Sequence, residues 1–533
     1  MIGDRFSTLF RSLGVKEALL ILLIALVPRC AGVGKTPTID ELTWIARSNS
    51  FAKTMLYRDW MGTQISQHPG QTIMWIGAAS IAPRILFDFL RERQPDQSLE
   101  VFMERYRLVD FMEEVQLGMS ICCSVLIAAS VWLFARLTDR RYALAVGILM
   151  AMEPILVGFS RLLHMDMLMS MLLLCSFLCL LECARRSSIF WPIASGIFGG
   201  LAILTKIPAI CIVGFMGLTC VYIVVVNMKR VGSLSWSTFI PSVRIFIAWC
   251  MACYGIIDIL WPAFFLHPIG VIKWILEGVF WGLETPHSIG SFFLGQNVER
   301  VSSLYIPVGL LTILSPLTFL LALPGAGILI SKLWHGKTRW WPVALASVMG
   351  FLFTGMMIMG AMKAVRYCLP AILSLELLAG VCVYHLLFSC SGRLGKALVG
   401  AAFLFAFFLS LWWFPYEITF VTPFVQGRSV MDDIIPRGWG EGLREAGQYL
   451  NSKPNATEMR VASWYDGLMA GYFDGEVTSL SEAMNEDIDY VLLYANQIQR
   501  NLHEKVLKTY RSRSPEKVIA IKGRDMVWIY KVH

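Results

Sequence analysis

The sequence predicts a mainly α-helical, polytopic membrane protein with a small soluble α/β domain at its C-terminus. Of its 533 residues, 56% are hydrophobic and only 16% are charged, and the mean hydropathy is +0.60. Because soluble proteins carry about 25% charged residues, this composition excludes a disordered chain, a secreted disulfide scaffold and a water-soluble multidomain enzyme. The segments 34–115 and 417–533 nevertheless have ordinary soluble composition. Enzymes that work at a membrane surface often need such parts, whereas channels and carriers seldom do.

Apolar runs of about 20 residues, the length that a spanning helix needs, define the membrane part. We expect about eleven spans in a module covering residues 1–416, with a long, partly helical first outer loop at about 34–115 and a C-terminal domain at 417–533. The expected spans are 17–33, 116–137, 142–160, 166–184, 190–205, 207–227, 245–265, 304–331, 341–361, 368–389 and 397–416.

Basic residues give the orientation, since the cytoplasmic loops of membrane proteins are enriched in Lys and Arg. The N-terminus is basic, and Pro28-Arg29-Cys30 offers no small-residue cleavage site for a signal peptide. We therefore expect a retained first helix in the plasma (inner) membrane, with the N-terminus in the cytoplasm and both soluble segments on the periplasmic or luminal side. The net charge of +8 reports this orientation and not nucleic-acid binding. The expected inner basic clusters are Arg136/Arg140/Arg141, Arg185/Arg186, Lys229/Arg230/Arg244, Lys332/Lys337/Arg339 and Arg393/Lys396.

The two outer segments contain further predictable elements. The apolar run Thr72–Ile81 is short for a span, so we expect an interfacial or re-entrant helix after a turn at His68-Pro69-Gly70. A helix at 441–450 and strand-like runs predict the α/β domain. The 13 cysteines lie almost entirely in or beside apolar runs and are interpreted as small buried hydrophobic residues. The strand-like runs are 460–463, 490–494, 518–521 and 526–530.

Asp40 and Glu41 follow the first span on the outer side. Neighbouring side chains on a helix point about 100° apart, so the two carboxylates are expected to do different jobs. One could face a cleft and act as a general base while the other caps the helix or forms an ion pair. The alternative is a helix N-terminus with an acidic first turn and no catalytic role.

Two further groups of ionisable residues lie where predicted spans meet the outer surface. Arg161, His164 and Asp166 stand between two strongly apolar spans, where charges are costly unless they are paired or functional. They form either a functional site or a mutually satisfied structural cluster. Lys206 interrupts an apolar stretch just before Pro208, and an ordinary interfacial lysine is the alternative interpretation.

Lys363, Arg366 and Tyr367 follow the outer end of another predicted span. Arg offers a planar fork that matches phosphate oxygens, and Lys offers a point charge, so the pair could clamp a lipid-linked phosphate. A stop-transfer flank is the alternative. His287 is a weaker candidate, because a lone histidine in a loop is usually structural. Acids and phosphate-seeking bases on one side of the membrane together suggest group transfer from a polyprenyl-phosphate donor.

The order of these residues resembles the GT-C superfamily of polyprenyl-phosphate-sugar glycosyltransferases. The resemblance is strongest to the branch with the protein O-mannosyltransferases and the lipid A aminoarabinose transferases, and it spans about residues 30–390. The combination is more specific than any of its parts. The matching residues are Asp40-Glu41, His68-Pro69-Gly70, Met74-Trp75-Ile76-Gly77, Ser160-Arg161, His164-Met165-Asp166, Leu204-Thr205-Lys206, Arg366-Tyr367 and Leu369-Pro370.

This resemblance implies an enzyme that transfers a sugar, with inversion, to an acceptor hydroxyl at the outer face. Asp40 would be the general base, with Glu41 and Asp166 as further acidic residues of the site. Its partners would be the lipid bilayer and a polyprenyl-phosphate-linked sugar. The C-terminal segment departs from the eukaryotic mannosyltransferases, so the acceptor stays open among protein, lipid and glycan. Candidate ligands of the donor phosphate are Lys206, Arg366, Lys363 and Arg161, and candidate cleft residues are His68, His164, His287 and Tyr367.

Two other functions remain open from the residues alone. A transporter or flippase of a lipid-linked or anionic solute would use the outer cations as a vestibule, and would be expected to carry ionisable residues at mid-membrane depth, often with discontinuous helices. Asp258 and Glu153 lie within or near spans, but no paired inverted pattern accompanies them. A scaffold subunit would keep the topology without turnover. The sequence requires no cofactor, and a divalent metal lacks support because two acids without a third ligand do not define a metal site.

Overall fold

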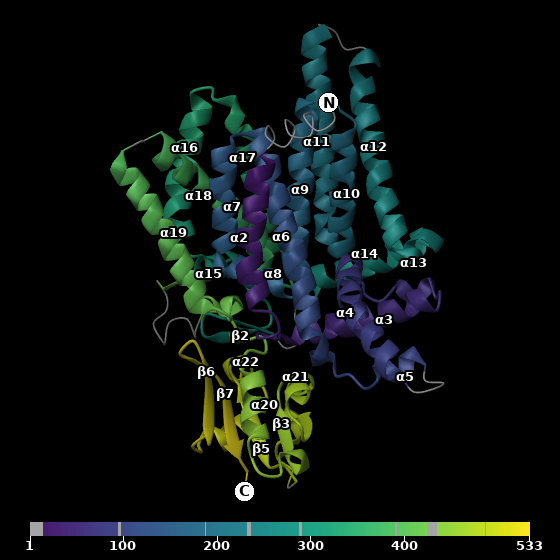
Figure 1. Ribbon diagram of the computed structural model, residues 1–533, viewed down its shortest axis with the longest axis vertical. Coiled ribbons are helices and arrows are strands. Elements are labelled where there is room, and N and C mark those ends of the chain that lie inside the picture. The colour runs from purple at the N-terminus through teal and green to yellow at the C-terminus, as the bar shows by residue number, and fades with distance from the viewer. Residues whose placement is uncertain are drawn as a thin grey trace.

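The computed structural model describes residues 14–93, 98–186, 188–231, 236–286, 290–389, 392–423, 434–485 and 487–532. A bundle of long helices occupies the upper part of Figure 1, and the C-terminal α/β domain lies below one end of it. The first outer segment lies beside that same end. His287 and residues 1–13, which include the basic residues Arg5 and Arg11, lie outside the described residues.

The bundle confirms the predicted polytopic helical membrane fold. Among the described residues, nine helices are long and apolar enough to cross a membrane, or ten if a bent pair counts as one span, close to the predicted number. The first helix, Val15–Ala31, and the helix Phe190–Thr205 are shorter than these nine. The bundle helices are α2 (Val15–Ala31), α6 (Met112–Leu137), α7 (Arg140–Met152), α8 (Pro154–Arg161), α9 (Met165–Arg185), α10 (Phe190–Thr205), α11 (Cys211–Val231), α12 (Trp236–Leu260), α15 (Tyr305–Ile313), α16 (Pro316–Trp334), α17 (Trp341–Met359), α18 (Leu369–Phe388) and α19 (Arg393–Trp413).

Two of the predicted spans are broken by proline. The run 142–160 bends by 66° between α7 and α8, where Pro154 begins α8. The run 304–331 divides into α15 and α16, with Ser315 capping α16 and Pro316 at its first position. Proline is favoured at the first turn of a helix because it lacks the N–H that would be unsatisfied there, so each proline starts a new helix with its own direction.

The predicted inner loops gather at the end of the bundle away from the C-terminal domain (Figure 1). Arg339, between α16 and α17, lies 3.8 Å from Asp139, between α6 and α7. Arg136, near the end of α6, lies 3.3 Å from Glu182, near the end of α9. These ion pairs bring loops from distant parts of the sequence together at one end, as alternation of the spans predicts.

The first outer segment forms a helical layer that carries part of the site. It contains α3 (Ile39–Leu56), η1 (Met61–Thr63), α4 (Gln71–Glu92), α5 (Leu99–Met103) and η2 (Leu108–Phe111). The prediction that the run Thr72–Ile81 is short was wrong, because α4 has 22 residues and is itself long and apolar enough to span. In Figure 1, α4 lies with α3 and α5 at the lower end of the bundle, a position that fits the predicted interfacial helix.

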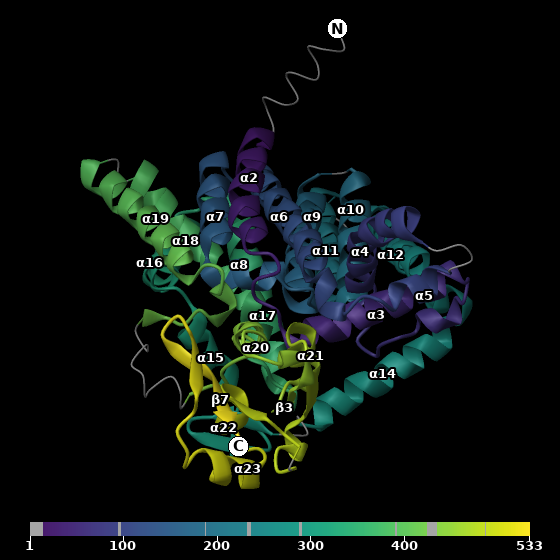
Figure 2. The ribbon, with the colours of Figure 1, turned by 60° about the horizontal axis from the view of Figure 1, so that its bottom comes forward.

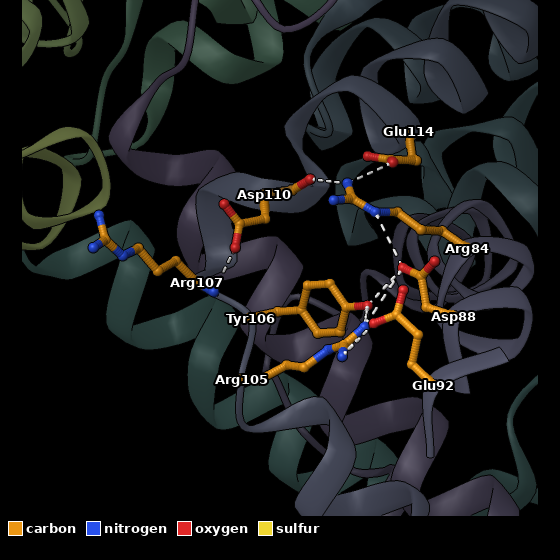
Figure 3. Close-up of polar contacts among 8 residues, drawn as sticks. All are labelled: Arg84, Asp88, Glu92, Arg105, Tyr106, Arg107, Asp110 and Glu114. Carbon is orange, nitrogen blue, oxygen red and sulfur yellow. Dashed lines mark hydrogen bonds and ion pairs between the residues drawn. The ribbon is translucent and has the colours of Figure 1, made fainter. Parts of the chain in front are cut away.

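Charged side chains hold this layer together (Figure 3). Arg84 of α4 donates to Glu114 of α6 over 2.8 Å, and the hydroxyl of Tyr106 donates to Asp88 over 2.6 Å. The charged groups are partly exposed, so each contact contributes little to stability. The network instead connects α4 to the residues before and at the start of α6. The residues drawn are Arg84, Asp88, Glu92, Arg105, Tyr106, Arg107, Asp110 and Glu114.

A second outer segment contains a helix that has no counterpart among the predicted elements. The helix α14 (Pro268–Glu284) follows α13 (Pro262–Leu266) and precedes a hairpin of β1 (Ser291–Phe293) and β2 (Gln296–Val298). It extends along the outer side of the molecule in Figure 2. Its end is tied to the segment before α18, because the amide of Ala361 donates to the carbonyl of Leu283 over 3.0 Å.

The C-terminal domain confirms the predicted α/β fold. Its five-stranded sheet has the order β4-β3-β5-β7-β6, in which β3 is parallel to β4 and β5, and β7 is antiparallel to β5 and β6. The strand β4 was not predicted. The boundary at 416/417 between the membrane module and the C-terminal domain stays a prediction. The elements are α20 (Leu443–Asn451), β3 (Arg460–Ser463), α21 (Asp466–Tyr472), β4 (Glu476–Ser479), β5 (Tyr490–Tyr494), α22 (Ala495–Gln499), α23 (Glu504–Tyr510), β6 (Lys517–Ile521) and β7 (Arg524–Lys531).

Candidate functional site

Glu41 caps the N-terminus of α3, which is one of the two tasks that the sequence left open for the adjacent carboxylates. It is fully buried and accepts hydrogen bonds from the amide and the hydroxyl of Thr38, which together close the N-terminus of α3. It also accepts from the side chain of Gln116 and the amide of Leu163. These contacts tie α3 to α6 and to the turn before α9.

Asp40 points differently, as expected for the next residue on a helix. Its side chain is 35% exposed and lines a cavity, whereas Glu41 does not. Its Oδ2 atom lies 3.5 Å from Nε2 of His164 and 3.6 Å from Nη2 of Arg366. Burial by itself would raise the pKa of Asp40, but the contacts with His164 and Arg366 outweigh it and hold that pKa below its ordinary value. Asp40 is therefore an ionised, accessible carboxylate at neutral pH.

Asp166 is the buried centre of the charge cluster. It lies in the first turn of α9 and is 1% exposed. Its Oδ1 atom is 2.7 Å from Nζ of Lys206, and its Oδ2 atom is 3.1 Å from Nε of Arg366 and 3.3 Å from Nδ1 of His164. Lys206 and Arg366 therefore balance the negative charges of Asp166 and Asp40, as buried charges require.

His68 and Tyr367 surround the same cluster. The Nζ atom of Lys206 lies 4.0 Å from the centre of the Tyr367 ring, within the range of a cation–π contact. Part of the His68 side chain is exposed to solvent. Desolvation by the protein atoms around it, and then repulsion from Lys206, nevertheless lower the pKa of His68 to about 4. His68 is therefore neutral at pH 7. The structure brings together seven of the residues that the sequence analysis singled out, which are Asp40, His68, His164, Asp166, Lys206, Arg366 and Tyr367.

Arg161 and Lys363 differ in their surroundings from this cluster. Arg161 is 1% exposed and forms a buried ion pair with Glu417, and it also donates to the carbonyl of Pro415 over 3.0 Å. Arg161 does not line the cavity, so its contacts are those of a link between α8 and the segment after α19. Lys363 does line the cavity, and its Nζ atom lies 3.4 Å from the carbonyl of Val301.

Trp439 is a site residue that the sequence did not reveal. Its ring lies 4.7 Å from the guanidinium of Arg366 and 5.2 Å from the ring of His164. The amide of Ile39 donates to the carbonyl of Trp439 over 3.0 Å, which connects the C-terminal domain to the start of α3. The glycines Gly438, Gly440 and Gly442 around Trp439 were the signal available in the sequence.

Gly440 shows why glycine is needed beside Trp439. Its φ is +123°, a conformation that residues with a Cβ atom rarely adopt. A Cβ atom there would also lie 2.5 Å from a methyl carbon of Leu468 and 3.3 Å from the carbonyl oxygen of Pro37. The glycine therefore lets the chain approach the first outer segment closely enough for Trp439 to cover the charge cluster.

A cavity of about 420 Å³ lies between the bundle and the C-terminal domain. Asp40, Lys363 and Arg366 line it from the membrane side, and Trp439 and Tyr465 line it from the C-terminal domain. The cavity is large enough for a sugar-sized ligand. Among the residues that the structure describes, no group of three or more His, Cys, Asp or Glu side chains could hold a metal ion.

Fold and site together define a multi-pass helical membrane protein with a charged cavity under an α/β domain. A model of the family described as dolichyl-phosphate-mannose-protein mannosyltransferase matches residues 105–256. This match confirms the resemblance predicted from the sequence, and its range includes Arg161, His164, Asp166 and Lys206. No curated protein matches the chain.

Two solved structures show similarity over most of the chain. The crystal structure of ArnT from Cupriavidus metallidurans bound to undecaprenyl phosphate is 13% identical, with a TM-score of 0.47, covering 96% of this chain and 97% of that one. The archaeal oligosaccharyltransferase AglB from Archaeoglobus fulgidus, in complex with an inhibitory peptide and a dolichol-phosphate, is 12% identical, with a TM-score of 0.45. Its match covers 91% of this chain and 70% of the AglB chain.

Proposed function

We propose that this protein is an integral-membrane glycosyltransferase that moves a sugar from a polyprenyl-phosphate donor to an acceptor hydroxyl. The observation that carries the proposal is the position of Asp40, an accessible carboxylate at the wall of a cavity that also presents Arg366 and Lys363. A base and phosphate-binding cations on one cavity wall are what such a transfer needs. The family model matched over residues 105–256 supports the same reaction class.

In the proposed reaction, Asp40 takes the proton of the acceptor hydroxyl as that oxygen attacks the anomeric carbon. The bond between the anomeric carbon and the phosphate oxygen breaks, its electron pair stays on that oxygen, and polyprenyl phosphate leaves. Attack opposite to the leaving group inverts the anomeric configuration. The contacts of Asp40 with His164 and Arg366 keep it ionised, so the base is ready before the acceptor arrives.

We assign the donor phosphate to Arg366 and Lys363, because both line the cavity. Arg366 would offer its fork to the phosphate oxygens and Lys363 a point charge. Lys206 is 4% exposed, does not line the cavity and lies 2.7 Å from Asp166. We therefore place Lys206 behind Arg366, where it compensates Asp166 and leaves Arg366 available to the phosphate. Glu41 and Arg161 take structural roles in this scheme.

The proposed location of this chemistry is the outer face of the plasma (inner) membrane. The site lies at the end of the bundle that faces the C-terminal domain, opposite to the clustered basic loops. Basic loops favour the cytoplasmic side. The site and the C-terminal domain would therefore lie in the periplasm or lumen.

The test is donor consumption by the purified full-length protein in lipid nanodiscs. The assay supplies a polyprenyl-phosphate sugar and cell-envelope extract as a source of acceptor, and measures the release of polyprenyl phosphate. We expect Asp40→Asn to lower the rate by at least 100-fold with an unchanged unfolding temperature. The matched control is Asp525→Asn, at an exposed position that does not line the cavity. Wild-type turnover in Asp40→Asn would exclude Asp40 as the base.

A comparison of nanodiscs with proteoliposomes separates the enzyme from a transporter. In proteoliposomes, a transporter or flippase would move the lipid-linked sugar across the bilayer without releasing polyprenyl phosphate. An enzyme would release polyprenyl phosphate in nanodiscs, where there is no second compartment. Movement without release would reject the proposed function.

A further inference from the structure

The helix α14 (Pro268–Glu284) lies across the outer end of the bundle. With 17 residues, it is not among the nine described helices that could cross a membrane. It runs across the direction of the spans, at the end of the bundle where the candidate site lies (Figures 1 and 2). A helix in this position lies parallel to a membrane that the spans cross.

One side of α14 packs against the protein. Val271, Ile275 and Gly278 on this side are buried. A Cβ atom at Gly278 would lie 2.7 Å from the Cβ atom of Gln67, so glycine allows the helix to approach the first outer segment closely. The side chain of Gln67 donates to the carbonyl of Trp274 over 3.4 Å. These contacts hold α14 beside the turn that precedes α4.

The remaining surface of α14 is divided into an apolar and a charged stripe. The apolar side chains follow the three- and four-residue spacing of one helix face and are 45% to 68% exposed. The charged side chains of Lys273, Glu277 and Glu284 are also exposed, and each follows a residue of the apolar stripe, about 100° further round the helix. This separation is typical of a helix at the boundary between lipid and water. The apolar stripe consists of Ile269, Ile272, Leu276, Phe280 and Leu283.

The apolar stripe continues a surface that faces lipid. The candidate span α12 exposes Met251 and Ile259. The helix α13, which connects α12 to α14, exposes Phe265 and Leu266. Apolar side chains therefore lead from the span into the stripe without a break between the elements. The outer leaflet that surrounds the end of α12 is the occupant that fits this continuous surface.

The end of α14 is attached to the segment that carries the proposed donor-phosphate residues. The amides of Ala361 and Met362 donate to carbonyls in the last turn of α14 over 3.0 and 3.3 Å. The next residue along the chain is Lys363, and Arg366 follows three positions later. Both line the cavity. Backbone hydrogen bonds thus link the depth of α14 in the membrane to the depth of these two cations.

We propose that α14 lies in the outer leaflet with its apolar stripe among the acyl chains, and that it sets the depth of Lys363 and Arg366. The polyprenyl chain of a donor occupies the acyl region, so its phosphate lies at the level of the head groups. Cations held at that level receive the phosphate while the chain stays in the leaflet. The lipid contact is independent of the proposed function, whereas the depth role rests on it, because it uses the assignment of both cations to the donor.

Photo-crosslinking tests the lipid contact. The full-length protein, with p-benzoylphenylalanine in place of Leu276, is irradiated in nanodiscs of phosphatidylcholine and phosphatidylglycerol, and lipid adducts are measured by mass spectrometry. The matched control carries the same group in place of Glu277, the next residue, on the charged stripe. We expect about tenfold more lipid adduct at Leu276 than at Glu277. Equal adduct at the two positions, or none at Leu276, would overturn the proposal.

Donor binding tests the depth role. Leu276→Asp places a charge among the acyl chains, which is costly, and should move α14 toward water. We expect the affinity of the protein in nanodiscs for undecaprenyl phosphate to fall about tenfold. The matched control is Lys273→Asp on the charged stripe, which should stay within about twofold of wild type. Leu276→Ser removes the apolar chain without adding a charge, so it should cause a smaller loss and serves if Leu276→Asp does not fold.

The control also separates depth from simple repulsion. Lys273→Asp changes the charge by two units and Leu276→Asp by one, so repulsion of the phosphate would cause the larger loss in Lys273→Asp. That result, or unchanged affinity in both Leu276 variants, would reject the depth role. If wild type does not bind undecaprenyl phosphate, the donor assignment of the proposed function fails together with the depth role. The lipid adducts at Leu276 would still decide whether α14 contacts the leaflet.

Discussion

The Nε2 atom of His164 lies 3.5 Å from Oδ2 of Asp40, and the opposite nitrogen of the same ring lies 3.3 Å from Asp166. One imidazole therefore connects the accessible carboxylate to the buried one. His164 is 4% exposed and packs its ring edge against Trp439, so its orientation is fixed by protein on both sides. This arrangement holds the proposed base in place and keeps its negative charge.

Replacing His164 tests its role as a positioning residue. The contact with His164 is one of the causes that lower the pKa of Asp40. In His164→Gln this pKa should rise toward the ordinary value of about 3.9, so the base becomes protonated at a higher pH than in wild type. We expect kcat to fall at least tenfold with little change in KM for the donor, and the acid limb of the kcat profile to move to higher pH. The control is His335→Gln, at an exposed position. An unmoved acid limb would contradict this role.

Glu41 should make stability depend on pH. Burial is the largest influence and raises the pKa of Glu41 to about 7, against about 4.3 in an unfolded chain. Between about pH 4.3 and 7 the folded protein holds a proton on Glu41 that the unfolded chain has lost. The contribution of Glu41 to the free energy of unfolding is therefore fully present at low pH and declines as the pH rises through this range. Each pKa unit corresponds to about 1.4 kcal/mol. Thermal unfolding from pH 5 to 8 should show a smaller decline in Glu41→Gln than in wild type, and equal declines would refute the assignment.

Trp439 should matter for turnover more than for folding of the bundle. Trp439→Ala removes the ring that covers Arg366 and His164 and opens the charge cluster to water, which weakens every charge interaction within it. We expect donor consumption to fall about tenfold or more, and Trp439→Phe to recover most of it because an aromatic face remains. Rates are compared at equal amounts of folded protein. Full activity of the alanine variant would show that the ring does not support the site.

Arg161 and Glu417 should behave as a structural pair. Removing one member leaves the other buried without a counter-charge, which typically costs about 3–5 kcal/mol. Arg161→Met and Glu417→Gln should each lower the unfolding temperature strongly, and the double variant should be less unstable than the sum of the single changes. Activity per folded molecule should stay near wild type. A selective loss of affinity for polyprenyl phosphate in Arg161→Met would instead return Arg161 to the donor site.

Much of the fold and part of the site follow from local sequence properties. Apolar runs predict the spans, basic loops predict which ends of the spans lie on the same side, and a helix with strand-like runs predicts the α/β domain. These features are local in the sequence, because burial and turn formation act on neighbouring residues. The separate tasks of Asp40 and Glu41 also follow from helical geometry. The breaks at Pro154 and Pro316 were not predicted, and the 66° bend at Pro154 depends on how the helices pack.

The sequence by itself determined a membrane helix bundle, its charged end and most of the residues of the candidate site. Only the tertiary structure decided which charges meet. Arg161 pairs with Glu417 across 256 positions, Trp439 reaches His164 from another domain, and three arginines of that domain face the cavity. The physical reason is that charge pairing and cavity shape depend on distances through space, which residue spacing does not encode between elements that fold far apart in the chain.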